Sequence, residues 1–201
     1  VIDYLTYGGL YREVWLEASA PSRLTDLFVY TPNLKEAAVQ WTAERLDGIA
    51  TVRIRLEDAA GRPLAEQTAD AAPNGALTLP ALEARPWSPE DPQLCRCTAE
   101  LLDAAGHVMD RRQVSFGFRT AVFRADGFYL NGKKTFLRGL NRHQSYPYIG
   151  YAAPESLQRE DARILQEELH CNAVRTSHYP QSPYFLDECD RRGLLVFTEL
   201  P

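Results

Sequence analysis

Hydrophobic and polar positions alternate along the first part of the chain. The run TVRIRLE places Val52, Ile54 and Leu56 on one side and charged residues on the other, which is typical of strands with one buried face. Turn signals such as Asp47-Gly48 separate the runs. The pattern predicts antiparallel β-structure between residues 23 and 119. Its other alternating positions are Leu27, Val29, Leu77, Leu79, Cys95, Cys97, Ala99, Leu101, Val114, Phe116 and Phe118.

The size and strand number of this region are those of an immunoglobulin-like sandwich. About seven strands in roughly 100 residues are typical of that fold, although the Cys-Trp-Cys spacing of antibody domains is missing. Trp87 lies in a Pro-rich connection, RPWSPEDP. Because large aromatic side chains mostly serve cores, we expect Trp87 to pack over one end of the sandwich, with stacking on a sugar as the alternative.

A different pattern follows residue 135, where short strands and helices alternate. We predict strands at 136–141, 173–176 and 194–198, a helix at 156–170, and a second helix that starts with Ser182 as its cap and ends at Gly193. This order predicts parallel pairing of the strands. The fold class is therefore multidomain, β followed by α/β. The apolar stripe of the first helix is expected to hold Leu157, Ile164, Leu165 and Leu169.

Two further segments connect these regions. Residues 1 to 18 contain Gly8-Gly9 followed by alternating Val14 and Leu16, which predicts either a strand whose partners precede residue 1 or an interdomain link. Residues 120 to 135 form a linker with a hairpin turn at Asn131-Gly132. We expect that hairpin to lie against the floor of the domain that follows.

Charge and cysteine content restrict the functional class. The net charge is −5 with no basic stripe, which argues against a nucleic acid or an anionic membrane surface as partner. The longest apolar runs are far shorter than the roughly 20 residues of a membrane-spanning helix. The four cysteines lack C-x-x-C spacing and are expected to be free and mostly buried, which favours the cytoplasm over the periplasm or secretion. They are Cys95, Cys97, Cys171 and Cys189.

Polar residues gather where each predicted parallel strand ends. In parallel α/β folds the carboxyl ends of the strands and the loops after them carry the ligands and the chemistry. We therefore expect these residues to face one site. They are Asn141, Arg142 and His143 after the first strand, Ser177, His178 and Tyr179 after the second, and Glu199 after the third.

Several stretches together resemble family 2 of the glycoside hydrolases, the β-galactosidase and β-glucuronidase group. They are FLRGLNRHQ, NAVRTSHYPQSPYFLDECDRRGLLVF, GFYLNGKKTFLRG, PWSPEDPQLCRCTAEL and DYLTYGGLYREVWLE. The resemblance implies a jelly-roll sugar-binding domain, an immunoglobulin-like sandwich and a (β/α)₈ barrel, in that order. Residues 1–18 would then be the last strand of the first domain or a link, 19–119 the sandwich, and 120–201 the start of the barrel.

The resemblance also implies the reaction. Retaining glycoside hydrolysis uses two carboxyl groups roughly 5 Å apart, and the family takes its acid/base Glu from after the fourth barrel strand and its nucleophilic Glu from after the seventh. Both are expected beyond Pro201, so the chain alone is expected to be inactive. Glu199 stands at an earlier strand end, and we expect it to orient a histidine or an arginine rather than to act on substrate.

The remaining candidates would support the site. His143 and His178 align with family histidines that contact sugar hydroxyls, the alternative being a structural histidine bonded to a backbone carbonyl. Arg138 and Arg175 are predicted within strands, where a buried guanidinium must be paired with a catalytic or a structural carboxylate. Asn141, Arg142 and Tyr179 would shape the loops. Three tyrosines could wall a sugar subsite or simply pack the loop; they are Tyr146, Tyr148 and Tyr151.

No cofactor is predicted, and no metal ligand is assigned. The two histidines lie on separate loops without the spacing of a zinc site, although the resemblance allows magnesium in the parent enzyme. The expected partner is a β-linked glycoside or oligosaccharide, most simply a β-galactoside because HQSYPYIGYA is similar to that branch, with β-glucuronidase as the alternative. The parent is expected to be a homo-oligomer. A non-catalytic carbohydrate-binding or scaffold module is the competing interpretation.

Overall fold

The structure, a computed structural model, describes residues 8 to 200. They divide into two compact units, which are described separately. The first, here called the sandwich unit, contains residues 17–88 and 93–134, and the second, the parallel unit, contains residues 8–16, 89–92 and 135–200. By its contacts the hairpin after residue 120 groups with the sandwich unit.

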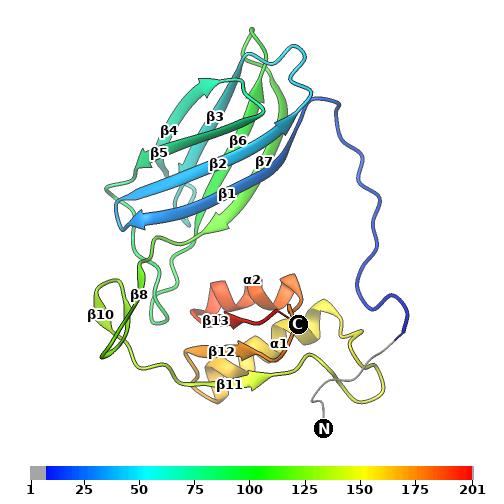
Figure 1. Ribbon diagram of the computed structural model, residues 1–201, viewed down its shortest axis with the longest axis vertical. Coiled ribbons are helices and arrows are strands. Elements are labelled where there is room, and N and C mark those ends of the chain that lie inside the picture. The colour runs from blue at the N-terminus through cyan, green and yellow to red at the C-terminus, as the bar shows by residue number, and fades with distance from the viewer. Residues whose placement is uncertain (1–7, 201) are drawn as a thin grey trace. The chain divides into compact units, whose positions relative to one another are not determined.

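The sandwich unit is built from two antiparallel sheets (Figure 1). One sheet has the order β1-β2-β5 and the other the order β4-β3-β6-β7. The strands are β1 (Arg23–Asn33), β2 (Glu36–Glu44), β3 (Thr51–Glu57), β4 (Pro63–Asp70), β5 (Asn74–Pro80), β6 (Cys95–Leu102) and β7 (Val108–Phe116). The predicted sandwich is confirmed.

The alternating residues of the strands fill the space between the two sheets. Val52, Ile54 and Leu56 are fully buried in this core, as a period of two requires for a strand with one covered face. Trp87 is only 2% exposed, and its backbone N–H donates to the carbonyl of Phe118 at 2.9 Å. The buried ring therefore offers no open face on which a sugar could stack. The predicted free cysteines are also present, three of them buried.

A small hairpin sheet completes the sandwich unit. Its strands are β8 (Ala121–Arg124), β9 (Gly127–Leu130) and β10 (Lys133–Lys134). The turn lies at Asn131-Gly132 as predicted, and both residues have positive φ, 51° and 79°, the conformation that two-residue hairpin turns require. The returning strand is Lys133–Lys134 rather than the residues from Thr135 onward.

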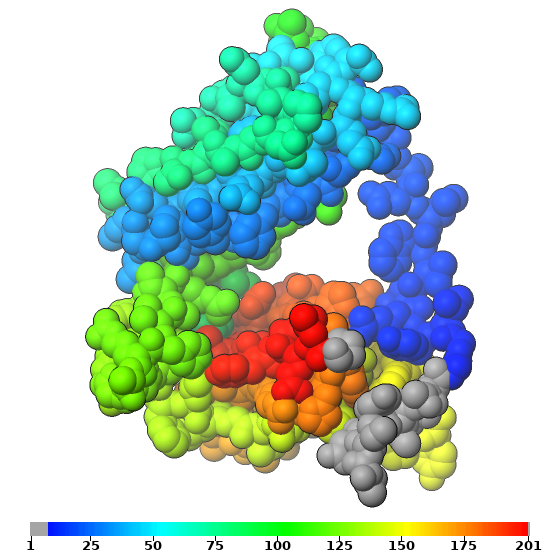
Figure 2. Space-filling model, in the orientation of Figure 1, coloured from blue at the N-terminus to red at the C-terminus, as the bar shows by residue number. Residues whose placement is uncertain are grey.

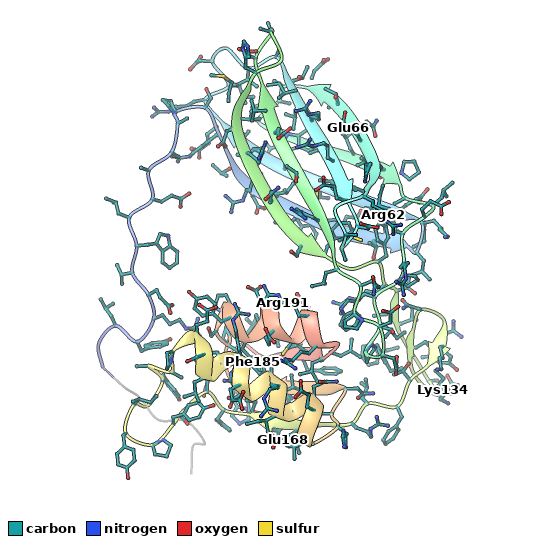
Figure 3. All side chains as sticks on the ribbon, turned by 180° about the vertical axis from the view of Figure 1, so that it is seen from behind. Arg62, Glu66, Lys134, Glu168, Phe185 and Arg191 are labelled. Carbon is teal, nitrogen blue, oxygen red and sulfur yellow. The ribbon has the colours of Figure 1, made fainter. Side chains whose placement is uncertain are left out.

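The parallel unit contains the predicted strand, helix, strand, helix, strand succession. Its strands pair in parallel in the order β11-β12-β13. The two helices cover one face of the sheet: Figure 1 looks onto the uncovered face, and Figure 3, from behind, has the helices in front. The elements are β11 (Gly139–Arg142), α1 (Glu155–Arg163), the π-helical turn η1 (Ile164–Glu168), β12 (Ala173–Thr176), α2 (Pro183–Arg192) and β13 (Leu195–Thr198).

The first strand of this unit begins three residues later than predicted. The Asn172 side chain accepts a hydrogen bond from the backbone N–H of Arg138 at 2.7 Å and donates to the carbonyl of Phe136 at 2.9 Å. These bonds occupy backbone groups that a strand ladder would otherwise use. Arg138 therefore lies outside the strand and is exposed, so its prediction as a buried strand residue is wrong.

The predicted apolar stripe of the first helix is partly wrong. Leu165 is buried, but Leu169 is 52% exposed, and the buried residues of α1 itself are Gln158 and Ala162. The π-helical turn after Arg163 changes the residues per turn, so that positions beyond it no longer continue the stripe of α1. In the second helix Ser182 is the N-cap residue as predicted, although its hydroxyl makes no capping hydrogen bond, and Gly193 ends the helix with φ 78°.

Residues 8 to 20 form no strand, and Val14 and Leu16 are exposed. Both interpretations, a strand whose partners precede residue 1 and an interdomain link, stay predictions; residues 1–7 and Pro201 lie outside the described part. Within residues 8–200 no helix combines the length and the apolar character needed to cross a membrane.

Candidate functional site

The carboxyl ends of the three parallel strands lie level with one another. Arg142 pairs with Thr176, and Thr176 pairs with Thr198, at the last position of each strand. The loops that follow therefore leave the sheet along one edge, which in parallel α/β folds is the edge where sites form. The register of the strands therefore brings the polar residues that follow them to one edge of the sheet, as predicted.

Glu199 binds one residue of β12 and one residue of the loop that follows β12. One of its carboxylate oxygens lies 2.8 Å from Nδ1 of His178, and the other accepts a hydrogen bond of 2.5 Å from Nε of Arg175. Nη1 of Arg175 also donates to Oδ1 of Asn141 at 3.4 Å. We call these four residues the Glu199 cluster. Arg175 is exposed on the sheet face without helices, so it is paired as predicted but not buried.

The chemistry of the Glu199 cluster follows from its charges. The hydrogen bond from His178, with that from Arg175, holds the pKa of Glu199 below its ordinary value, so the carboxylate is ionised at neutral pH. An ionised carboxylate only accepts hydrogen bonds, which assigns the hydrogen on His178 to Nδ1. Nε2 of His178 is then free of this bond and can meet a ligand hydroxyl.

The two predicted histidines lie together. The rings of His143 and His178 have centroids 5.4 Å apart and meet edge to face. His143 also packs against the ring of Tyr179 at 6.2 Å. Two imidazoles at one strand edge, one of them fixed by a carboxylate, can donate to and accept from neighbouring hydroxyl groups, as a sugar would present.

Arg142 lies beneath these histidines and is only 6% exposed. Its Nε and Nη2 donate to one oxygen of Asp161 at 2.8 and 2.6 Å. Nη2 also donates to Gln158 at 2.7 Å, and Nη1 donates to Gln181. We call these residues, with Tyr146, the Arg142 cluster. When the N–H groups of a buried guanidinium have hydrogen-bond acceptors, most of the free-energy cost of burying the charge is avoided.

The Arg142 cluster joins the sheet edge to both helices. The guanidinium lies 3.9 Å from the centre of the Phe185 ring, which Figure 3 labels on α2. On the side of α1, Tyr146 donates its hydroxyl hydrogen to Asp161. Burial, together with this bond to a carboxylate, raises the pKa of Tyr146 well above its usual range. The loop after β11 is therefore tied to α1 and α2.

The three loop tyrosines differ in what they contact. Tyr146 is held by Asp161, and Tyr151 packs against Tyr179 at 5.2 Å and Tyr11 at 5.9 Å. Tyr179 accepts a hydrogen bond from the backbone N–H of Gln144, and burial, with the neighbouring Tyr151, raises the pKa of Tyr179 to about 12. Tyr148 lies at a turn tip and is fully exposed. For all three tyrosines the role of a subsite wall stays a prediction.

Sequence reasoning missed the residues that support the loops. Gln158 and Asp161 were not selected because polar residues on a helix are usually solvated, yet both lie on the turn of α1 that faces Arg142. Their spacing of three, which puts two side chains on one helix face, was the available signal. Gln144 and Gln181 are also buried, and no sequence pattern distinguished them from surface glutamines.

The described residues offer no obvious metal site. Residues 8–200 contain no group of three or more His, Cys, Asp and Glu side chains that could hold a metal ion. One polar atom near the site does lack a partner among these residues: Oγ of Ser177, which is buried directly before His178.

The chain combines a sandwich with three parallel strands and two helices, and it carries two histidines and a paired carboxylate at the ends of those strands. Two family models match, "Glycosyl hydrolases family 2" over residues 22–119 and "Glycosyl hydrolases family 2, TIM barrel domain" over residues 122–201. The chain belongs to glycosyl hydrolase family 2. Its predicted fold class and family are confirmed.

Named relatives come from two branches of that family. A β-galactosidase of Thermoanaerobacterium thermosulfurigenes is 40% identical over 100% of this chain and 30% of its own length. A putative β-glucuronidase of Formosa agariphila is 34% identical, over 99% of this chain and 25% of its own. The structure of Bacteroides uniformis β-glucuronidase 3 matches with a TM-score of 0.85 and 30% identity, over 96% of this chain and 25% of that one. The chain thus spans less than a third of these proteins.

Proposed function

We propose that this chain forms the sandwich and the first part of the catalytic barrel of a retaining exo-glycosidase that removes terminal β-linked sugars. The observation that supports this most directly is the Glu199 cluster beside His143, at the level ends of the parallel strands. In a family 2 barrel this edge faces the sugar. His143 and His178 would bind its hydroxyls, and Arg175 with Asn141 would line the same face.

The two catalytic carboxyl groups are proposed to come from outside residues 1–201. Glu199 is a poor candidate for either role because each of its oxygens already accepts a hydrogen bond from a neighbour. The hydrogen bonds from His178 and Arg175 also lower the pKa of Glu199, which disfavours it as the acid that protonates the leaving group. We assign it instead to fixing the His178 ring. The proposal places no residue of this chain on a metal ion.

The proposed substrate is a β-galactoside. The β-galactosidase of T. thermosulfurigenes, at 40% identity, favours this branch. A β-glucuronide is the second candidate, because the matched B. uniformis structure is a β-glucuronidase. The full-length protein is further proposed to be a homo-oligomer, which light scattering measures directly.

Hydrolysis of nitrophenyl β-galactoside and nitrophenyl β-glucuronide tests the proposal. The full-length protein should cleave one of them, preferably the galactoside, and residues 1–201 alone should cleave neither. Release of nitrophenol by residues 1–201 alone would show that a carboxyl group of this chain is catalytic. A full-length protein that binds these glycosides without cleaving them would instead support the non-catalytic carbohydrate-binding module.

A further inference from the structure

The segment of residues 8 to 16 has no regular structure, yet two of its residues contact the candidate site. The segment groups with the parallel unit although more than a hundred residues separate the two in sequence. Figure 2 shows its blue atoms beside the red and orange atoms of the C-terminal part of that unit. The function proposed above gives this segment no role.

Arg12 bonds to the two loops that carry the histidines. Its Nη2 donates to Oε1 of Gln144 at 3.4 Å and to the carbonyl oxygen of Pro180 at 3.0 Å. Gln144 directly follows His143 and is 2% exposed, so the first acceptor is a fixed part of its loop. Pro180 lies two residues after His178. One guanidinium nitrogen therefore connects the loop after β11 to the loop after β12.

Tyr11 makes a second contact with the candidate site, through aromatic rings. Its ring meets that of Tyr151 edge to face at 5.9 Å, and Tyr151 packs on Tyr179 at 5.2 Å. Tyr179 in turn contacts His143 at 6.2 Å. Rings of this spacing attract each other and resist sliding. The segment thus reaches His143 by a row of side chains as well as through Arg12.

We propose that Arg12 is a positioning residue that sets the distance between the loops of His143 and His178. The inference rests on the proposed glycosidase function, in which both imidazoles must meet hydroxyls of one sugar ring. A displacement of about 1 Å at such a site can cost on the order of a hundredfold in rate. A planar guanidinium holds two acceptors in fixed geometry, which the single flexible ammonium of lysine does not.

The test compares Arg12→Met with wild type in the full-length protein. We expect kcat on the preferred glycoside to fall about tenfold or more while KM changes less, since misplacement affects the rate more than binding. Hydrogen exchange should increase in residues 143–151 and 177–182 together, and the midpoint of thermal unfolding should stay unchanged because Arg12 is exposed. Arg12→Lys should recover only part of the loss.

A matched control is Arg23→Met, which removes an exposed arginine that pairs with Glu44 at 3.0 Å in the sandwich unit. It should alter neither kinetics nor exchange in the two loops. Wild-type kinetics and wild-type exchange in Arg12→Met would overturn the inference. If the wild type hydrolyses neither glycoside, the proposed function fails, and hydrogen exchange alone then decides whether Arg12 connects the loops.

Discussion

Among residues 8–200, each of the two units buries one charged side chain, Glu100 in one and Arg142 in the other, and their hydrogen-bond partners come from different kinds of position. In the sandwich unit Glu100 has no exposed surface and accepts hydrogen bonds from Arg53 at 2.6 Å, Arg55 at 3.0 Å and Arg111 at 2.9 Å. Arg53 and Arg111 are its direct cross-strand neighbours on β3 and β7. The regular register of the sheet therefore supplies the partners of Glu100.

Arg142 in the parallel unit obtains its partners from irregular positions. They come from α1, from the loop before α2 and, through Asp161, from Tyr146 in the loop after β11. The hydrogen bonds of Glu100 connect strands that are already neighbours in the sheet, so they stabilise that sheet without changing its shape. The Arg142 cluster instead determines where the loops of the candidate site lie, which is why the two buried charges should respond differently to removal.

The largest effect is expected for Arg142→Met. The change leaves the buried Gln158 and Gln181 without their donor and removes the ion partner of Asp161, which is partly exposed and keeps its bond from Tyr146. Removing one member of a buried ion pair costs about 3–5 kcal/mol. Urea unfolding of the full-length protein measures the loss, and hydrolysis of the preferred glycoside should fall with it. Full stability and full activity in this variant would break the comparison, because Arg142 would then be no more important than a surface arginine.

Glu100→Gln should cost less, about 1–3 kcal/mol, because the amide can still accept a hydrogen bond and its arginines can reach water. Burial acts to raise the pKa of Glu100, but the hydrogen bonds from Arg53 and Arg111 outweigh it, and the net pKa lies below the ordinary value of 4.5. Its stabilisation is thus complete above that ordinary value and is lost as the pH falls through the folded-state pKa.

The pH dependence separates the charge of Glu100 from its packing. Unfolding free energies measured from pH 7 down into the acid range should decline less steeply in Glu100→Gln than in wild type. Equal slopes would mean that the ionised carboxylate contributes no stability to the sheet.

The sandwich was largely predictable from sequence, with two exceptions that have physical causes. Alternation located β1, β3, β5, β6 and β7, but β2 buries Ala37, Ala38 and Val39 in succession, and β4 is a mostly polar edge strand. The core residues of β2 do alternate at Ala37, Val39, Trp41 and Ala43, but buried Ala38 interrupts the pattern, and no residue of β4 is fully buried. Residue pattern identifies a strand only when one face is covered and the other is solvated.

The site was predictable only where position along a strand determined it. His178 and Glu199 were selected because they follow parallel strands, and the structure places them 2.8 Å apart. Asp161 and Arg12 depend on tertiary folding: one lies on a helix face, and the other bonds to Gln144 across 132 positions of sequence. No local pattern encodes such contacts.

A smaller, purely kinetic effect is expected for Glu199→Gln. Glu199 is partly exposed and its amide replacement can still bond His178, so the fold should persist while the tautomer of the ring is no longer fixed by a charge. We expect kcat/KM for the preferred glycoside to fall about tenfold, equivalent to about 1.4 kcal/mol, with an unchanged unfolding midpoint. Complete loss of activity would instead indicate that Glu199 takes part in the reaction itself.

The smallest effect is expected at Arg159, which provides the surface counterpart of Arg142. Arg159 donates to Glu155 on α1 and to Glu188 on α2 at 2.8 and 3.0 Å, two acidic partners where Arg142 has one, but its side chain is 28% exposed whereas that of Arg142 is 6% exposed. Exposed ion pairs contribute about 0–1 kcal/mol, so Arg159→Met should change urea unfolding by less than about 1 kcal/mol and leave hydrolysis unaltered. A loss as large as that of Arg142→Met would show that the number of ionic partners, rather than burial between loops, determines the importance of an arginine in this unit.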